Sequence, residues 1–259
     1  SHYKLFTIII LFIFSCQNEP ITCDVLIYNG TVYDGTGEPP YLGSVGITDD
    51  KITYVGKNTR FEADTIIDAT NLSISPGFIN MLSWGYSSLM EDGRSLSDLK
   101  QGVTLEVFGE GVSPGPYVKE GERFSLKYAM EALENRGVST NIASFLGATT
   151  ARVIEVGFEN RPATEQEMER MKQMVQESME QGAMGIGSSL IYAPADYAPT
   201  QELVELCRVA SKNGGMYISH MRNEDNLLME ALEELITIAK EAEIPAEIYH
   251  LKASREANW

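Results

Sequence analysis

The chain has 259 residues and an apolar content of 43%, which suits one large α/β domain or a small domain beside a larger one. It carries 37 acidic and 20 basic residues, so its formal net charge is −17. Binding to nucleic acid or to an anionic membrane surface requires a basic face, and we therefore expect neither partner.

The first 16 residues have the pattern of a secretory signal. Lys4 precedes an apolar run over 5–14, shorter than the roughly 20 residues that a membrane-spanning helix needs. The run leads to Ser15-Cys16, and residues 13–16 resemble a bacterial lipobox, whose cysteine receives a lipid. We expect a lipoprotein signal peptide over 1–16, and an exported protein, periplasmic or anchored to the outer membrane through Cys16. The alternative is an apolar N-terminal strand of the core.

Two cysteines follow the signal. Cys23 ends a spacer over 17–23, and Cys207 lies on the apolar side of a predicted helix. An exported protein permits a disulfide between them, but two cysteines alone are weak support for one. A small buried hydrophobe is the favoured interpretation of Cys207.

Residues 24–75 are rich in strand signals. Apolar and polar residues alternate there, and the pattern breaks at the turn dipeptides NG (29–30), DG (34–35) and DD (49–50). No long helical period appears before Pro76. The sequence predicts a small antiparallel β domain over 24–75.

From Pro76 onward, strand and helix patterns alternate. The predicted strands cover 78–82, 103–108, 140–146, 184–188, 216–220 and 246–250. The predicted helices cover 125–136, the segment after a capping box at 164–167 up to Gly182, 200–212 and 226–243. This alternation predicts parallel βα units. Six strands are visible, whereas a complete βα barrel has eight in about 250 residues. We expect an α/β, TIM-like barrel over 76–259 that is incomplete at its C-terminus.

Two of the three histidines, His220 and His250, end predicted strands, whereas His2 lies in the signal segment. The C-terminal ends of barrel strands are where active sites lie, and imidazole is the commonest side-chain metal ligand. The sequence therefore predicts a metal-dependent hydrolase with both histidines in its site.

The sequences of several motifs resemble those of a known family. The segments IIDATNLSISPGFIN, GVTLEVFGEG, GSSLIYAPADYA, ISHMRNE and YHLKA are similar to those of the amidohydrolase superfamily, and within it to the N-acyl-D-amino-acid deacylase (D-aminoacylase) group. The resemblance implies a βα barrel beside a small β-sandwich built from both chain ends. It also implies hydrolysis of a linear amide by zinc-activated water, with an N-acyl-D-amino acid giving a D-amino acid and a carboxylate.

Two departures from the family pattern concern the metal. Leu82 and Trp84 occupy the positions of the usual His-x-His, so we expect one zinc rather than two. The remaining site implies a strand-two ligand together with His220 and His250.

The strand-two cysteine of the group is also missing. The usual GNCG reads GEG here, which makes Glu110 the expected substitute ligand, since carboxylates also bind zinc. Glu106 is the alternative, because period-two alternation would place it on the strand face of Glu110.

The resemblance further implies that Lys252 and Tyr192 bind the substrate carboxylate, and Arg222 and Glu224 are expected to form a pair that supports the His220 loop. The family's general-base aspartate would lie beyond residue 259, so these 259 residues alone are expected to be inactive. Two alternatives stay open: another amidohydrolase, such as a cyclic amidase or a dipeptidase, and a non-catalytic, surface-anchored binding protein. The oligomeric state is not indicated.

Overall fold

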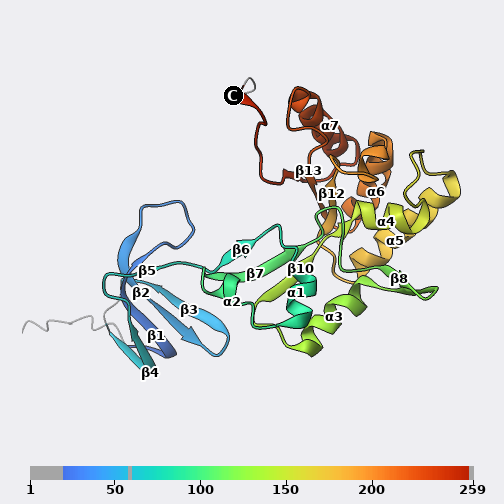
Figure 1. Ribbon diagram of the computed structural model, residues 1–259. Coiled ribbons are helices and arrows are strands. Elements are labelled where there is room, and N and C mark those ends of the chain that lie inside the picture. Colours follow the sequence, from blue (N-terminus) through green and yellow to red (C-terminus); the bar gives the residue numbers. More distant parts are fainter. Residues whose placement is uncertain (1–19, 58–59, 257–259) are drawn as a thin grey trace, which may run out of the picture. The chain divides into compact units, whose positions relative to one another are not determined.

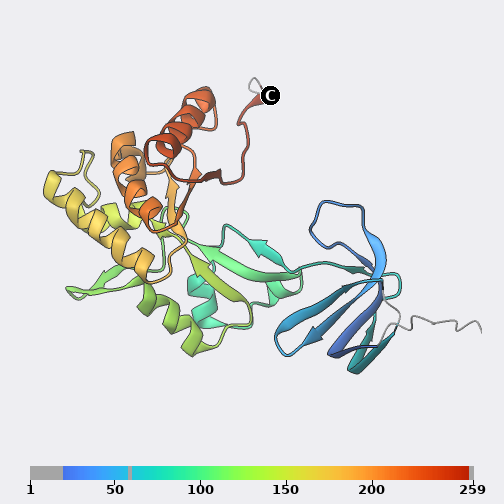
Figure 2. The same ribbon diagram turned by 180° about the vertical axis from the view of Figure 1, so that it is seen from behind.

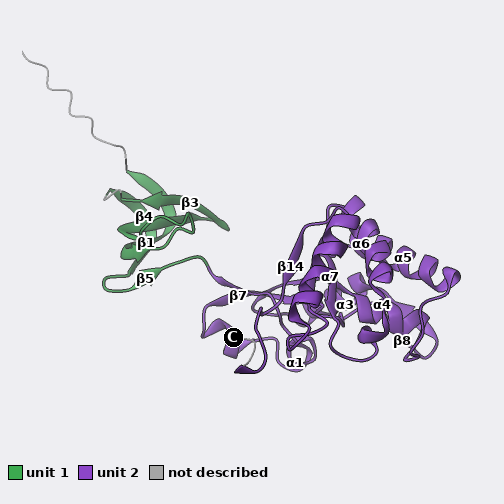
Figure 3. Cartoon of the chain, turned by 90° about the horizontal axis from the view of Figure 1, so that it is seen from above, with its two compact units in different colours: residues 1–76 green, residues 77–259 purple. Residues whose placement is uncertain are grey.

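The computed structural model describes residues 20–57 and 60–256 (Figure 1). The predicted signal peptide and Cys16 lie outside the described residues. The chain divides into two compact units, residues 1–76 and 77–259 (Figure 3). Among the helices of the described ranges, none combines the length and the apolar character that crossing a bilayer requires.

The first unit contains one five-stranded sheet. Its strands are β1 (Ile21–Val32), β2 (Tyr41–Thr48), β3 (Lys51–Gly56), β4 (Phe61–Asp68) and β5 (Ser73–Ile74). The order is β3-β2-β1-β4, and β5 also pairs with β1. The pairs β1–β2 and β2–β3 are antiparallel, but β4 and β5 run parallel to β1. The prediction of a purely antiparallel unit is wrong, because the chain crosses from β3 at one edge to β4 at the other instead of forming another hairpin.

The predicted turn at Asn29-Gly30 is also wrong. Both residues lie inside β1, where the register with β2 shifts between Ile27 and Gly30, and Asn29 has φ +62°. A β-bulge uses the same positive-φ residues as a tight turn, so the dipeptide alone does not separate the two. The turn predicted at residues 49–50 is present between β2 and β3, with Asp49 at φ +54°.

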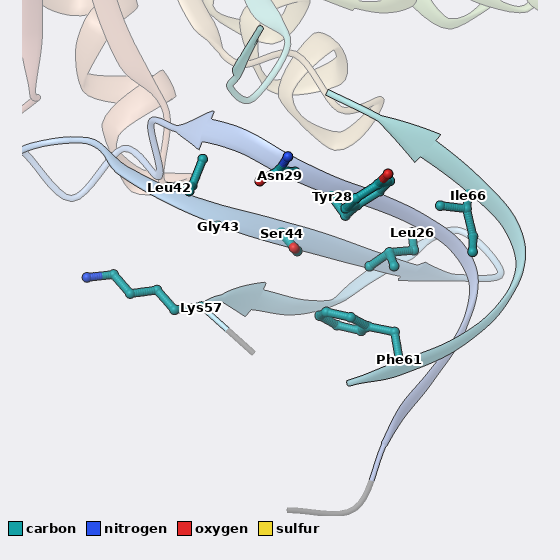
Figure 4. Close-up of a pocket in the computed structure, with 9 residues that line it drawn as sticks. All are labelled: Leu26, Tyr28, Asn29, Leu42, Gly43, Ser44, Lys57, Phe61 and Ile66. Carbon is teal, nitrogen blue, oxygen red and sulfur yellow. The ribbon is translucent and has the colours of Figure 1, made fainter. Parts of the chain in front are cut away.

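A hollow of about 570 Å³ lies on this sheet (Figure 4). It is lined by Leu26, Tyr28, Asn29, Leu42, Gly43, Ser44, Lys57, Phe61 and Ile66. This lining contains neither a carboxylate nor an imidazole, and the predicted metal ligands Glu110, His220 and His250 all belong to the second unit.

The second unit is built on parallel strands that follow one another in chain order. They are β6 (Phe78–Asn80), β7 (Val103–Phe108), β10 (Asn141–Ser144), β11 (Leu146–Gly147), β12 (Gly185–Ser189), β13 (Met216–His220) and β14 (Ala246–Ile248). The orders are β10-β7-β6 and β11-β12-β13-β14. Only Phe145 separates β10 from β11, and its N–H donates to the Phe108 carbonyl. All six predicted strands are therefore present, the third in two parts.

Helices cover one side of these strands (Figures 1 and 2). The predicted ones are α3 (Leu126–Arg136), α5 (Glu165–Glu180), α6 (Thr200–Lys212) and α7 (Leu228–Glu241). Thr164 caps α5 with the predicted capping box. The sequence did not predict α1 (Tyr86–Glu91), α2 (Leu96–Leu99), α4 (Ala148–Glu155), the 3-10 turn Ala195–Tyr197 or the hairpin of β8 (Tyr117–Lys119) and β9 (Glu122–Phe124). Elements this short present too few residues for a hydrophobic period to emerge.

Strand side chains alternate in direction and contribute to three apolar clusters, of which the third consists of Leu89, Phe108 and Leu133. Ile186 and Tyr217 pack with the helices in the larger cluster, which also contains Cys207. Val107, Phe145, Ile218 and Tyr249 form a smaller cluster on the opposite face. Cys207 is free, and burial raises the pKa of its thiol, which agrees with a packing role. Cys23 is likewise buried, and among the described residues neither cysteine forms a disulfide.

Candidate metal centre

Glu110, His220 and His250 meet beyond the C-terminal ends of β7, β13 and β14. One ligand atom from each lies within 4.8 Å of the others. Glu110 Oε1 is 3.1 Å from His220 Nδ1 and 3.5 Å from His250 Nε2. The two imidazole rings are nearly perpendicular, with centroids 4.5 Å apart. The structure thus brings together the three residues predicted to bind metal.

Each of the three residues reaches the site by a local backbone feature. His220 is the last residue of β13 and shares the strand face of Ile218, opposite the helices. Glu110 follows Gly109, whose φ is +106° and where a Cβ would lie 2.5 Å from the Phe145 carbonyl oxygen, so only glycine fits there. His250 has φ +33°, a conformation that is uncommon for a non-glycine residue.

Glu106 is not at this site, so the expectation that it shares the face of Glu110 is wrong. Its carboxylate accepts hydrogen bonds from the hydroxyls of Ser83 (2.7 Å), Ser95 (2.7 Å) and Thr140 (3.0 Å). The physical reason is the turn at Gly109, which ends the period-two alternation before Glu110 is reached.

Glu224 and Lys252 complete the charged side chains around the imidazoles. Glu224 Oε1 lies 3.4 Å from His220 Nε2 and 3.4 Å from His250 Nδ1. Lys252 Nζ lies 3.1 Å from Glu224 Oε1 and 3.2 Å from His250 Nδ1. Glu110 and Glu224 therefore contact opposite nitrogens of the same two rings.

The expected pair of Arg222 with Glu224 does not form. Arg222 instead makes a two-pronged contact with Glu234 on α7, with distances of 2.8 and 2.7 Å. It also donates to the carbonyls of Asp196 and Ala198, so it ties the loop after β13 to neighbouring segments. Hydrogen bonding to Glu234 raises the pKa of the Arg222 guanidinium further.

Leu82 and Trp84, which stand where the family pattern has histidines, follow β6. Trp84 Nε1 donates to Glu110 Oε2 at 2.9 Å, and Leu82 packs against the smaller apolar cluster. Trp84 thus holds one carboxylate oxygen of Glu110 while the other faces the imidazoles.

Two tyrosines border the site. The Tyr192 ring lies 5.3 Å from the His220 ring in an edge contact and is largely exposed. Tyr249 is buried, and no described residue forms a hydrogen bond with its hydroxyl. Burial, and then the negative charge of Glu110, raise the pKa of Tyr249. The sequence reasoning missed Tyr249 and the role of Glu224; the H-x-x-x-E spacing from His220 was the available signal for Glu224.

The donor set fits a zinc ion. Tetrahedral zinc with nitrogen and oxygen ligands near 2.1 Å requires ligand atoms about 3.4 Å apart. The two separations from Glu110 Oε1 are 3.1 and 3.5 Å. The nitrogens that face Glu110 Oε1, His220 Nδ1 and His250 Nε2, are the ones available to the ion. The other nitrogen of the His220 ring, Nε2, is buried on the Glu224 side and makes no hydrogen bond within the described residues. Three protein ligands with an open fourth position is the pattern of catalytic zinc.

Known proteins with similar sequences and structures belong to the group that the sequence motifs resemble. No protein-family model matches the chain. It is 32% identical to a D-aminoacylase of Alcaligenes xylosoxydans xylosoxydans over 94% of this chain and 53% of the relative. A solved D-aminoacylase structure, concerned with the functional role of its binuclear metal centre, matches with TM-score 0.84 and 30% identity, over 92% of this chain and 53% of that one. An N-acyl-D-glutamate deacylase from Bordetella bronchiseptica, complexed with zinc and a phosphonate inhibitor, matches with TM-score 0.83 and 27% identity, over 93% and 53%.

The α/β fold and the sequence are thus homologous to those of amidohydrolases, which confirms the predicted resemblance. Within that class the homology is specifically to D-aminoacylase and the other N-acyl-D-amino-acid deacylases. The chain spans about half the length of the curated relatives it matches.

Proposed function

We propose that the full-length protein hydrolyses a linear amide, converting an N-acyl-D-amino acid into a D-amino acid and a carboxylate. The observation that carries this proposal is the convergence of Glu110, His220 and His250 at the carboxyl ends of three parallel strands, in a chain homologous to D-aminoacylase. Enzymes with this kind of strand arrangement place their reactive groups at that end.

We further propose one zinc ion per chain, held by Glu110, His220 and His250. Bound zinc lowers the pKa of its water and polarises a substrate carbonyl. A single ion is supported by Leu82 and Trp84, which stand where the family pattern has histidines and cannot bind a second zinc. In the D-aminoacylase with the binuclear metal centre, one metal activates the enzyme and the second attenuates it.

Lys252 and Tyr192 are the proposed contacts for the substrate carboxylate. Lys252 is half-exposed and pairs with Glu224. Because an ammonium has three N–H donors, this pairing leaves a donor for the substrate carboxylate. Tyr192 is exposed beside His220 and offers a phenol donor. Together they would orient the substrate from the solvent side of the imidazoles.

The remaining structural proposals concern the whole protein. Six parallel strand positions in chain order, with helices on one side, are the arrangement from which two further βα units would close a barrel. The N-terminal sheet is proposed as one layer of a β-sandwich. Export and a lipid anchor at Cys16 are proposed from residues 1–16 alone.

Metal content and stereoselectivity of the full-length protein test the proposed function. We expect about one equivalent of zinc, lost in His220→Ala and His250→Ala, and hydrolysis of N-acetyl-D-methionine in preference to its L-enantiomer. Preference for the L-enantiomer would contradict the substrate assignment. A folded, metal-free and inactive protein would instead favour a binding protein on the same fold.

A further inference from the structure

Glu224 is a buried acid that is not needed as a metal ligand in the proposed site. The residue is 8% exposed, and its carboxylate contacts three cationic or potentially cationic groups: His220, His250 and Lys252. All three contacts involve the same oxygen, Oε1, at 3.1–3.4 Å. Because a buried carboxylate is costly unless paired, this placement calls for a specific role.

The protonation of the two rings explains the placement. An imidazole nitrogen that binds a metal cannot also carry a proton, so a neutral ring must carry its proton on the other nitrogen. The nitrogens facing Glu110 are His220 Nδ1 and His250 Nε2. The protons of metal-binding rings must then sit on His220 Nε2 and His250 Nδ1, and these are the two nitrogens that face Glu224.

Lys252 competes for one of these nitrogens. Its ammonium, which can only donate, lies 3.2 Å from His250 Nδ1. A hydrogen bond from Lys252 to that nitrogen would leave the ring proton on Nε2, the nitrogen that faces Glu110. Lys252 alone would therefore favour the tautomer of His250 that cannot bind metal. In the structure the ammonium contacts both acceptors, Glu224 Oε1 at 3.1 Å and His250 Nδ1 at 3.2 Å, so Glu224 competes with the ring nitrogen for the same donor.

We propose that Glu224 is a positioning residue that sets the tautomers of both metal-binding histidines. Its Oε1, 3.4 Å from both His220 Nε2 and His250 Nδ1, is placed to accept the N–H groups that metal binding would leave on those nitrogens. It also competes with His250 Nδ1 for the Lys252 ammonium. This role rests on the proposed function, since it takes zinc to be bound on the Glu110 side of the rings. Carboxylates that accept the second N–H of a ligating histidine are a general feature of zinc sites.

Zinc affinity of the full-length protein, measured by competition with a chromophoric chelator, tests this role. Glu224→Gln is expected to lower zinc affinity about 10- to 100-fold, the usual effect of losing such a partner. Adding Lys252→Met to this variant should recover part of the loss, because the competing donor is then gone. A purely structural defect at Glu224 would not be repaired by removing its neighbour.

Glu230→Gln is the matched control, because it removes the same charge from an exposed position on α7; it should bind zinc as the wild type does. The role of Glu224 is overturned if Glu224→Gln binds zinc like the wild type, if the double variant is no better than Glu224→Gln, or if Glu230→Gln is equally impaired. In each of these cases a zinc-binding wild type leaves the proposed function standing. A wild type that binds no zinc contradicts both.

Discussion

Two groups of buried polar side chains in the second unit differ in how their acidic and basic members are paired. Between α4 and α6, Arg152 Nη1 contacts both carboxylate oxygens of Glu202 at 2.9 and 2.8 Å, and its Nη2 donates to two backbone carbonyls. At the candidate metal centre, His220 Nε2 and the Tyr249 hydroxyl are buried and find no hydrogen-bond partner in the described part of the chain. Arg152 Nε also lacks a partner among the described residues, so neither group is fully satisfied. The first group pairs one guanidinium with one carboxylate and joins two helices. The second places two carboxylates, Glu110 and Glu224, against the same two imidazoles.

Removing one partner of the Arg152–Glu202 ion pair should have the largest effect on stability. Arg152 and Glu202 are 1% and 4% exposed, so Glu202→Ala leaves an uncompensated guanidinium in the core. We expect a loss of about 3–5 kcal/mol in the free energy of unfolding. Chemical denaturation of the full-length protein, followed by circular dichroism, measures this loss.

The double variant Arg152→Met with Glu202→Leu is the control for this prediction. Replacing both charges by apolar groups removes the unpaired ion, so the double variant should be more stable than Glu202→Ala alone. A double variant as unstable as Glu202→Ala would mean that lost packing, rather than an unpaired charge, causes the effect.

The same contrast recurs within a single chain segment, between Glu106 and Glu110. Glu106 is enclosed by three hydroxyl donors, while Glu110 faces two imidazoles. Glu110→Gln should reduce zinc affinity by more than the roughly 10- to 100-fold typical of outer partners, with little change in stability. Glu106→Gln should leave zinc affinity unchanged and cost about 1–3 kcal/mol of stability, because an amide nitrogen cannot accept from a hydroxyl. Chelator competition and denaturation on both variants would reveal a reversal, which would contradict the placement of these carboxylates.

Much of the second unit could be predicted from the sequence. Its six strands and four longer helices carry clear hydrophobic periods, and two histidines at strand ends indicate a shared edge. Glu110 could be predicted only through its position in a family motif, since nothing in the local pattern distinguishes it from Glu106. The turn at Gly109 decides between them, and it depends on the close approach of the Phe145 carbonyl from the next strand.

Contacts between distant residues are what the sequence did not reveal. Arg222 selects Glu234 rather than Glu224 because α7 folds back beside the loop after β13. In the first unit, β4 pairs in parallel with β1 because the chain crosses to that edge of the sheet. The alternation of apolar and polar residues along β4 would be the same at either edge, so the sequence pattern does not indicate which one the strand joins.

The smallest predicted effect concerns Trp84. It separates the roles of the two carboxylate oxygens of Glu110, one of which accepts a hydrogen bond while the other faces the imidazoles. Its indole N–H donates to Glu110 Oε2, leaving Oε1 for the imidazoles. Trp84→Phe keeps an aromatic ring but removes this donor, and we expect zinc affinity to fall about fivefold, equivalent to ~1 kcal/mol for one partly exposed hydrogen bond. Trp84→His tests the same position differently, because a histidine there restores part of the family pattern. If Trp84 excludes a second metal as proposed, Trp84→His should bind more zinc than Trp84→Phe does, and equal metal contents would contradict that role.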